Sequence, residues 1–376
     1  MSEEVTRGRI LVSCVNCVMD TTDRDIWFND EGVCRYCLSH QGRLSPAQQS
    51  IVHSSRQLDK YLDRVRTDGA GSRYDCVVGL SGGVDSSYLA LLLMQFDIRP
   101  LLVHVDAGWN SEIAVGNIEA ILDHTGFDLE TLVVDWPSMR DLQLAYFRSG
   151  VLALDMPQDH AFIVGVQRVA RQYGIRWNFT GWNSATESVL PMSWTWNMRD
   201  VQNMRDIATQ FGGAMPSRYP LMRSSEYLSY RLNRFRRLDP LEYVDYVKDE
   251  AISRLETVGW RPYPRKHGES KFTAIYQDYI LPVRWGIDKR KPHLSSLILA
   301  GQLTRSEAEA TLARPAHDGL DVPNELSFLA RKLEVTDADL LSLVHGPRRE
   351  HLDFSHGYWF ERALSRTRAL RAKLTS

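Results

Sequence analysis

The feature that most constrains this 376-residue chain is a glycine-containing loop between an apolar run and a helix-forming run. Residues 74–79 are mostly apolar with two adjacent valines, the loop follows at 80–87, and residues 88–94 are almost entirely apolar. A short β-branched run bounded by glycine predicts a buried parallel strand. The chain is therefore expected to build a parallel sheet around a strand–loop–helix unit.

The loop has a composition suited to a phosphate chain, and its sequence is Ser81-Gly82-Gly83-Val84-Asp85-Ser86-Ser87. Two glycines allow a tight turn with inward backbone N–H groups, and the N-terminus of the following helix favours negative charge. Ser86 and Ser87 add hydroxyl donors, and Asp85 can hold Mg²⁺ on the phosphates. The loop lacks the lysine of a Walker A motif, so it belongs to another class of nucleotide loop. A plain Gly-Ser turn is the alternative.

This loop resembles the SGGxDS loop of the ATP pyrophosphatases, the PP-loop enzymes. The resemblance implies that residues 81–87 bind the β,γ-pyrophosphate of ATP and leave the α-phosphate open to attack. It also implies that the enzyme adenylates a substrate oxygen, with ATP and Mg²⁺ required and with Ser81 and Asp85 in the catalytic machinery.

Alternating strand and helix signals continue after this unit. We expect strands at 76–80, 100–106, 131–135 and 177–180, and helices at about 86–96, 111–126, 138–149 and 158–173. Repeated βα units of this length predict an α/β fold with a doubly wound parallel sheet, whose ligand lies beyond the carboxyl ends of the strands. Strand signals end near residue 220. The predicted divisions are a metal module (1–44), a linker helix (45–72), the sheet domain (73–219) and a helical region (220–376) that binds substrate and partners.

Four of the five cysteines form two CxxC pairs near the N-terminus: Cys14, Cys17, Cys34 and Cys37. Two such pairs at this separation suit a tetrahedral Zn²⁺ site, and four thiolates leave no open position for catalysis. Incidental or redox-active cysteines are the alternative. The fifth, Cys76, lies in the strand before the loop and is expected to be a buried hydrophobic residue.

Polar residues follow two later strands at the predicted ligand edge. At the end of the second strand lie His104 and Asp106, and Gly108 follows them; Asp106 can accept a hydrogen bond from a ribose hydroxyl, and Gly108 would allow adenine to approach. A structural turn is the alternative for each.

At the end of the fourth strand, Gly181, Asn183 and Glu187 can complete the nucleotide and metal site. Glu187, like Asp159, is also a candidate catalytic carboxylate. Asn183 as a helix N-cap is the alternative.

Two other polar groups extend the candidate site. At the start of the helix near 158, Asp155, Asp159 or His160 could orient a nucleophile or take a proton, although a charge favoured by the helix dipole is equally expected for Asp159. Between 260 and 296 the candidates for phosphate or carboxylate recognition are Lys266, His267, Glu269, Lys289, Arg290 and His293. A solvated basic face is the alternative for this segment.

The composition limits the partners. A formal net charge of −2 gives no general attraction to nucleic acid. We expect no membrane span and no secretory signal, and hence a cytoplasmic protein.

The chain as a whole is similar to the N-acetyl sugar amidotransferases. The resemblance rests on the opening motif 14–23, the second cysteine pair, the loop 81–87, and the segments 181–187, 266–270 and 286–290. It implies that ATP adenylates the carbonyl oxygen of a sugar acetamido group and that ammonia then displaces AMP, leaving an acetamidino group. The implied setting is the biosynthesis of bacterial surface polysaccharides such as O-antigen and of nonulosonates.

The same resemblance implies the partners. The substrate would be an N-acetylated nucleotide sugar, and ammonia would come from a separate glutaminase through a companion barrel subunit. No cysteine of this chain has a nucleophile-elbow context, which also indicates an external ammonia source.

Two alternatives are weighed against this function. A zinc-containing PP-loop enzyme that thiolates tRNA would commonly need a catalytic cysteine near the adenylate, and no cysteine follows Cys76. The near-neutral charge also disfavours tRNA. A non-catalytic scaffold is the other alternative, and the intact loop argues against it.

Overall fold

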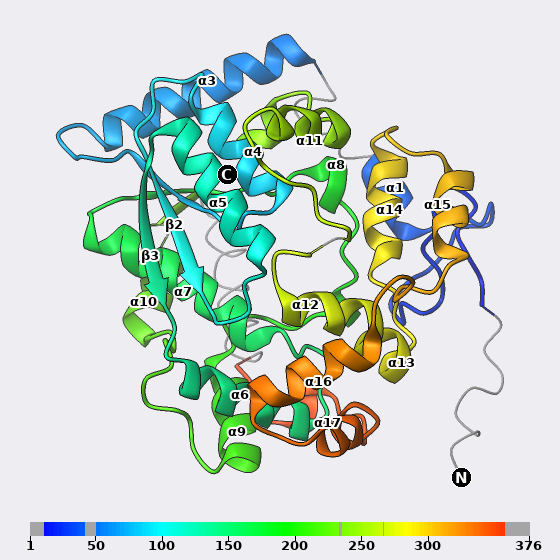
Figure 1. Ribbon diagram of the computed structural model, residues 1–376. Coiled ribbons are helices and arrows are strands. Elements are labelled where there is room, and N and C mark those ends of the chain that lie inside the picture. The colour runs from blue at the N-terminus through cyan, green and yellow to red at the C-terminus, as the bar shows by residue number, and fades with distance from the viewer. Residues whose placement is uncertain (1–10, 42–49, 233–234, 266, 358–376) are drawn as a thin grey trace, which may run out of the picture.

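A five-stranded parallel sheet forms the centre of the computed structural model, which describes residues 11–41, 50–232, 235–265 and 267–357 (Figure 1). Its strands are β1 (Cys76–Gly79), β2 (Pro100–Asp106), β3 (Asp128–Val133), β4 (Trp177–Phe179) and β5 (Arg236–Leu238). The spatial order is β3-β2-β1-β4-β5, and every neighbouring pair is parallel. Strands β2 and β3 are added on one side of β1, and β4 and β5 on the other. The strand order therefore reverses between β1 and β4, and a doubly wound sheet binds its ligand at such a point.

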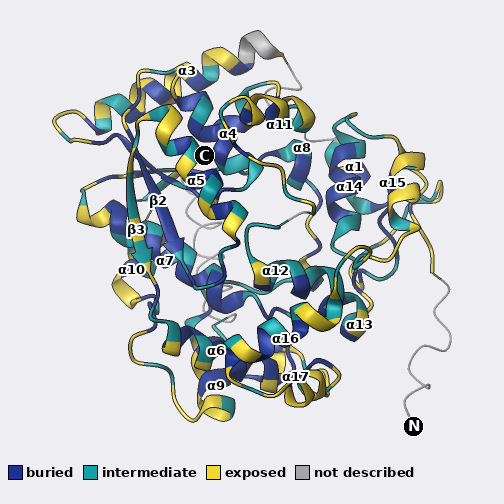
Figure 2. Cartoon of the chain, in the orientation of Figure 1, coloured by how far each residue is buried: buried dark blue, intermediate teal, exposed yellow. Residues whose placement is uncertain are grey.

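Helices cover both faces of this sheet, as the alternation of side chains along the strands requires. Val77 and Val103 face α6 (Trp136–Ser149) and α7 (Met156–Gln172), whereas Cys76, Val78 and Leu102 pack with the other set of helices. That set is α3 (Ile51–Asp68), α4 (Val84–Leu93) and α5 (Glu112–Thr125). Strands β1 and β2 are almost entirely buried, whereas the edge strand β3 and the outer helix faces carry exposed residues (Figure 2). The predicted α/β class is confirmed.

The remaining described elements lie mostly beside and below the sheet (Figure 1). They include the helices α1 (Arg35–Gln41), α8 (Ser184–Glu187), α9 (Val201–Gly212), α10 (Ser224–Arg231), α11 (Lys248–Glu256), α12 (Lys271–Ile275), α13 (Leu281–Trp285), α14 (Arg290–Leu299), α15 (Arg305–Leu312), α16 (Val322–Leu333) and α17 (Asp337–Val344). Short turns are η1 (Met192–Trp194), η2 (Pro240–Tyr243), the π-helical η3 (Tyr276–Ile280) and η4 (His351–Asp353). In the described parts of the chain, no helix is both long and apolar enough to cross a membrane.

Two strand predictions need correction. Strand β3 runs from 128 to 133 rather than 131 to 135, because this edge strand alternates exposed and half-buried residues instead of being uniformly apolar. The expectation of no strand after about 220 is wrong, since β5 pairs with β4. Its residue Arg236 bonds Asp68 and lies over the ring of Trp177, and a charged edge strand of this kind lacks the apolar signal.

Candidate functional site

The phosphate loop is folded back on itself between β1 and α4. The Ser81 and Ser86 hydroxyls lie 3.2 Å apart, and the backbone N–H of Gly83 donates to Ser81 Oγ at 3.2 Å. Gly82 has φ +81°, a left-handed conformation that a residue with a Cβ adopts only with strain. A Cβ there would also lie 2.7 Å from the carbonyl oxygen of Ala114. The loop conformation therefore depends on this glycine.

Three side chains from later in the chain hold the Gly82 carbonyl oxygen. Trp260 Nε1 donates at 2.8 Å, Tyr263 Oη at 2.9 Å, and Asn117 Nδ2 at 3.4 Å. Trp260 is fully buried, so its N–H needs a partner inside the protein. These bonds fix the orientation of the central peptide of the loop and join it to the segment 260–263.

Asp85, in the first turn of α4, is held by two donors. Tyr246 Oη donates to Asp85 Oδ1, and Asn183 Nδ2 lies 3.3 Å from the same oxygen. Burial is the main cause that raises the pKa of Tyr246, so this phenol stays protonated and donates. A half-buried carboxylate beside a phosphate loop is a suitable Mg²⁺ ligand. Asn183 also caps α8 by accepting from the backbone N–H of Thr186, so both of its expected roles are compatible.

The loop forms one wall of a cavity of about 440 Å³, a size typical of small-molecule sites. The lining residues are Ser81, Gly83, Val84, Asp85, Ser86, Gly181, Trp182, Thr186, Glu187, Lys248, Ile252, Trp260, Pro262, Tyr263, Arg265, His267, Glu269 and His293. Its walls therefore combine the loop with aromatic, basic and acidic side chains from segments far apart in the sequence.

The structure brings together ten of the predicted site residues in this lining: Ser81, Gly83, Val84, Asp85, Ser86, Gly181, Glu187, His267, Glu269 and His293. Eight others do not line it: Gly82, Ser87, His104, Asp106, Asp159, Asn183, Lys289 and Arg290. Lys266 lies outside the described residues. Gly82 and Asn183 still act on the site through the bonds given above, whereas Ser87 is buried within α4.

The end of β2 has a structural role rather than the nucleotide contacts expected for it. The ring nitrogens of His104 lie 2.9 Å from the Leu80 carbonyl oxygen and 2.9 Å from Asn110 Nδ2. Asp106 accepts from the backbone N–H of Gly108 at 2.7 Å. The ring of Trp136 fills the space beside Gly108, where an added Cβ would lie 2.4 Å from a ring atom.

This strand end instead positions the segment that carries Glu269. The backbone N–H of Ser111 donates to the Glu269 carbonyl oxygen at 2.9 Å, and that of Lys271 donates to the Trp109 carbonyl oxygen at 2.8 Å. Glu269 in turn lies 3.4 Å from His267 Nδ1. The main-chain pairing therefore places both residues at the cavity.

The start of α7 differs from expectation at His160. Its Nδ1 lies 2.6 Å from the Met198 carbonyl oxygen and its Nε2 accepts from the backbone N–H of Met222 at 3.0 Å. Burial lowers the pKa of His160 to about 4, so it is a neutral structural residue and not a proton carrier. Asp155 and Asp159 are a neighbouring pair whose pKa values are raised, chiefly by burial.

Two basic residues predicted to bind substrate have structural partners. Arg290 forms a two-pronged pair with Asp288, with contacts of 2.7 and 3.0 Å, and also donates to the Arg314 carbonyl oxygen at 2.9 Å. Lys289 Nζ donates to the Trp194 carbonyl oxygen at 3.2 Å. Arg290 therefore fixes the start of α14 rather than facing the cavity.

Sequence reasoning missed several lining residues. Trp182 lies between β4 and α8, and Lys248 and Ile252 lie on α11; nothing in their local sequence marks them as functional. Arg265 was also missed, and Asp278 binds it at 2.7 Å. The density of Trp and Tyr around 260–263 was the one available signal, because such rings often line ligand sites.

The four predicted metal ligands converge in the N-terminal segment. The Sγ atoms of Cys14, Cys17, Cys34 and Cys37 lie within 4.8 Å of one another, and all four residues are buried. Tetrahedral Zn²⁺ with Zn–S bonds of about 2.3 Å requires sulfur separations of roughly 3.8 Å. The Cys14–Cys37 and Cys17–Cys34 separations are 3.8 and 3.6 Å. Backbone N–H groups of residues 16 and 34 point at Cys14 Sγ, as in thiolate ligands. The donor set therefore fits zinc.

This cysteine module is attached to α14 and α15. The backbone N–H of Val18 donates to Ser295 Oγ at 3.3 Å, and Lys291 forms an ion pair with the buried Asp20. The Cys17 carbonyl oxygen accepts from Arg305 Nε at 3.3 Å. Since α14 also carries His293, the module supports one wall of the cavity.

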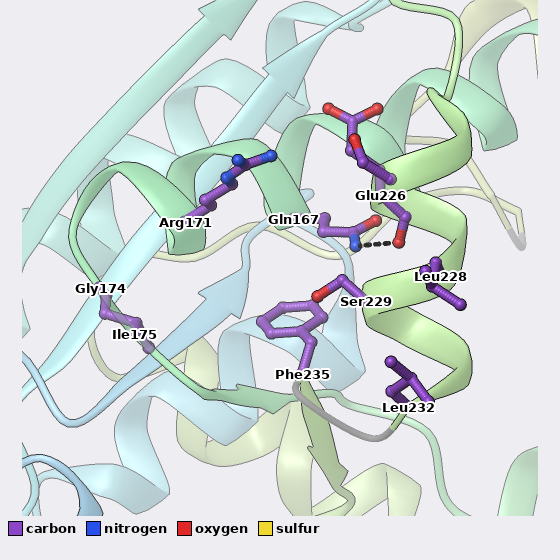
Figure 3. A pocket seen from close by; sticks show the side chains of 10 residues that line it. Gln167, Arg171, Gly174, Ile175, Glu226, Leu228, Ser229, Leu232 and Phe235 are labelled. Carbon is purple, nitrogen blue, oxygen red and sulfur yellow. Dashed lines mark hydrogen bonds between the residues drawn. The ribbon is translucent and has the colours of Figure 1, made fainter.

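A second cavity, of about 450 Å³, lies between α7 and α10 (Figure 3). Gln167 Nε2 donates to the Glu226 carbonyl oxygen across it, and Phe235 and Leu232 close one side. None of the loop residues lines this cavity, so the candidate active site is the cavity at the phosphate loop.

Comparisons with known proteins bear on the C-terminal quarter of the chain. Residues 269–366 match the family described as "LPS biosynthesis protein WbpG-like, C-terminal domain". This match supports the resemblance to surface-polysaccharide enzymes inferred from the sequence. A search of curated proteins gives no significant match.

Several solved structures show limited similarity, each at 16% identity. A predicted subunit of tRNA methyltransferase from Methanocaldococcus jannaschii covers 48% of this chain and 74% of its own, with a TM-score of 0.28. NMN synthetase from Francisella tularensis covers 57% and 89%, with a TM-score of 0.29. The U34-tRNA thiolase NcsA from Methanococcus maripaludis covers 81% and 90%, with a TM-score of 0.33. Similarity at this level carries no functional argument.

Proposed function

We propose that this chain, whose C-terminal quarter is similar to a lipopolysaccharide-biosynthesis family, is an ATP-dependent amidotransferase that converts a sugar acetamido group into an acetamidino group. One observation carries the proposal. A single cavity is lined both by the phosphate loop and by Glu269 and His293, which belong to the segment that matches this family. This shared lining supports a site in which a phosphate-binding loop faces part of the segment that matches a lipopolysaccharide-biosynthesis family.

The proposed reaction has two steps. The acetamido oxygen attacks the α-phosphorus of ATP, the bond from that phosphorus to pyrophosphate breaks, and pyrophosphate and an O-adenylated imidate that keeps the amide hydrogen on its nitrogen form. Ammonia then adds to the imidate carbon, the carbon–oxygen bond breaks, and AMP leaves with the former acetamido oxygen. Adenylation is needed because an unmodified amide oxygen is a poor leaving group.

The protein contributes position and electrostatics to both steps. Backbone N–H groups of the loop, with the Ser81 and Ser86 hydroxyls, would hold the pyrophosphate, and Asp85 would hold Mg²⁺, which neutralises phosphate charge. Of the two further carboxylates predicted to be catalytic, Glu187 lines the cavity and Asp159 does not. We therefore assign to Glu187 the proton released when ammonia attacks.

An external source of ammonia is part of the proposal. The chain has five cysteines. Four form the metal cluster, and Cys76 is buried in β1, where burial raises its pKa well above the usual value. A glutaminase of the cysteine type therefore has no nucleophile in this chain. The same observation disfavours tRNA thiolation, because no cysteine lines the cavity.

The test is a reaction with ATP, Mg²⁺, ammonium and a panel of N-acetylated nucleotide sugars. We expect AMP and pyrophosphate to form only with an accepted sugar, and the sugar product to have the mass expected when O is exchanged for NH. Omitting ammonium should prevent the mass change. AMP formation that requires tRNA and ignores every sugar would exclude this function.

A further inference from the structure

The wall opposite the phosphate loop carries a lysine, Lys248, whose ammonium group is held in place by neighbouring side chains. Lys248 is the first residue of α11 and lines the cavity together with Ser81 and Ser86. Its Nζ lies 3.0 Å from His293 Nε2, and its backbone N–H donates to Gln302 Oε1 at 3.1 Å. Both ends of this residue are therefore held.

The protonation of His293 follows from its second contact. Its Nδ1 lies 3.2 Å from the carbonyl oxygen of Thr186, and a carbonyl can only accept, so Nδ1 carries the hydrogen. The lone pair of Nε2 then faces Lys248 and accepts one of the three ammonium hydrogens. The imidazole is neutral in this arrangement. The neutral imidazole of His293 therefore orients the Lys248 ammonium group without neutralising its positive charge.

The charges in the rest of the lining show why a cation is needed here. Asp85, Glu187 and Glu269 are carboxylates, and a nucleotide adds about four more negative charges with its phosphates. Arg265, the other strong base in the lining, is bound to Asp278. The backbone N–H groups of the loop and one divalent ion would balance only part of the negative charge of the carboxylates and phosphates. A cation on the opposite wall would balance more of it.

The packing places Lys248 close to the start of the loop helix. Helix α11 lies against α4, with Ala251 and Leu89 in one buried cluster. Tyr246, two residues before Lys248, donates to Asp85 in the first turn of α4, and its ring centroid lies 5.6 Å from that of Tyr88. The N-terminus of α4 and the N-terminus of α11 therefore flank the same space.

We propose that Lys248 binds the phosphate chain of ATP from the wall opposite the loop, and that His293 is the positioning residue that holds it there. This rests on the proposed use of ATP but not on the identity of the sugar. It assigns His293 a role behind the lysine rather than the substrate contact expected from the sequence.

The test is direct binding of Mg²⁺ and a non-hydrolysable ATP analogue to the full chain, with no sugar present. We expect Lys248→Met to weaken binding about 100-fold, since it removes a charge-assisted contact to phosphate but keeps the aliphatic stem. Lys60→Met, on the exposed face of α3, is the matched control and should bind as the wild type does. Thermal unfolding of each variant checks that it folds.

The positioning role of His293 needs its own variants. His293→Ala should raise KM for ATP about tenfold with a smaller change in kcat, and His293→Gln should restore most of the loss because an amide oxygen can accept from Lys248. Unchanged analogue binding by a folded Lys248→Met protein overturns the proposal, as does a defect confined to nucleotide-sugar binding. A wild-type chain that binds no ATP analogue also overturns it. Normal analogue binding without any sugar-dependent AMP would instead refute only the proposed function.

Discussion

The two walls of the cavity are built in different ways. The loop wall is one contiguous stretch between β1 and α4, whereas the opposite wall collects side chains from α8, α11, the segment 260–269 and α14. The first wall contains the groups that suit a phosphate chain. The second contains aromatic, basic and acidic groups, including the Lys248–His293 pair proposed to act on ATP, and part of it is supported by the cysteine module. The first wall can therefore be recognised from adjacent residues of the sequence, and the second cannot.

The largest expected effect is at the loop wall. Asp85→Asn should lower pyrophosphate release by roughly 10²–10³-fold, the typical cost of losing one electrostatic group at a reacting centre. Its amide oxygen can still accept from Tyr246, so thermal unfolding should change little. Asp59→Asn, at an exposed site on α3, is the matched control. Activity within a few-fold of wild type would remove Asp85 from the metal site.

The next prediction compares two glycine variants, one of which adds only backbone strain while the other also adds a steric clash in the loop wall. Gly82→Ala combines a positive φ with a Cβ 2.7 Å from the Ala114 carbonyl oxygen. Gly71→Ala has the same φ of +81° and no atom within 4 Å of the added Cβ. In both variants the backbone strain should lower the free energy of unfolding by about 1–2 kcal/mol. Only Gly82→Ala should also lose pyrophosphate release, and equal activity in the two would contradict the loop geometry.

Metal removal tests the opposite wall. A chelator, or Cys34→Ser, should lower the melting temperature and raise KM for ATP, because the cysteine module that supports α14, and with it His293, loses its centre. Lys291→Ala breaks only the ion pair to Asp20 and should give a weaker version of the same change. An unchanged melting profile after verified metal loss would argue against a structural role for the cluster.

The smallest expected effects concern the bonds that join the two walls. Trp260→Phe and Tyr263→Phe each remove one donor to the Gly82 carbonyl oxygen, worth about 1 kcal/mol or roughly fivefold in KM for ATP. Because both donors share one acceptor, the double variant should depart from additivity. Strict additivity would mean that the donors do not act on the loop together.

The same contrast explains what the sequence could predict. The loop 81–87, the cysteine cluster and four of the five strands are local patterns, and each was found from residues adjacent in sequence. Strand β5 was missed because Arg236 and Arg237 are paired through side chains rather than buried. Lys248 was missed because its importance depends on His293, 45 residues away.

Some predicted site residues have structural partners that the sequence did not reveal. His104, His160 and Arg290 are residue types that are common in active sites. In this structure, each forms hydrogen bonds with carbonyl, amide or carboxylate groups of the protein itself. Residue type and position at a strand or helix end cannot distinguish a ligand contact from a satisfied structural contact. Only the hydrogen-bond partners seen in the folded structure distinguish a ligand-binding residue from a structural one.

The fate of the acetamido oxygen decides whether this cavity adenylates the sugar. An accepted N-acetylated nucleotide sugar would be labelled with oxygen-18 at the acetamido carbonyl and incubated with ATP, Mg²⁺ and ammonium. If the two walls form one adenylating site for that oxygen, the label leaves the sugar and appears in AMP in equal amount to the amidine formed. An amidine product accompanied by unlabelled AMP would contradict the account.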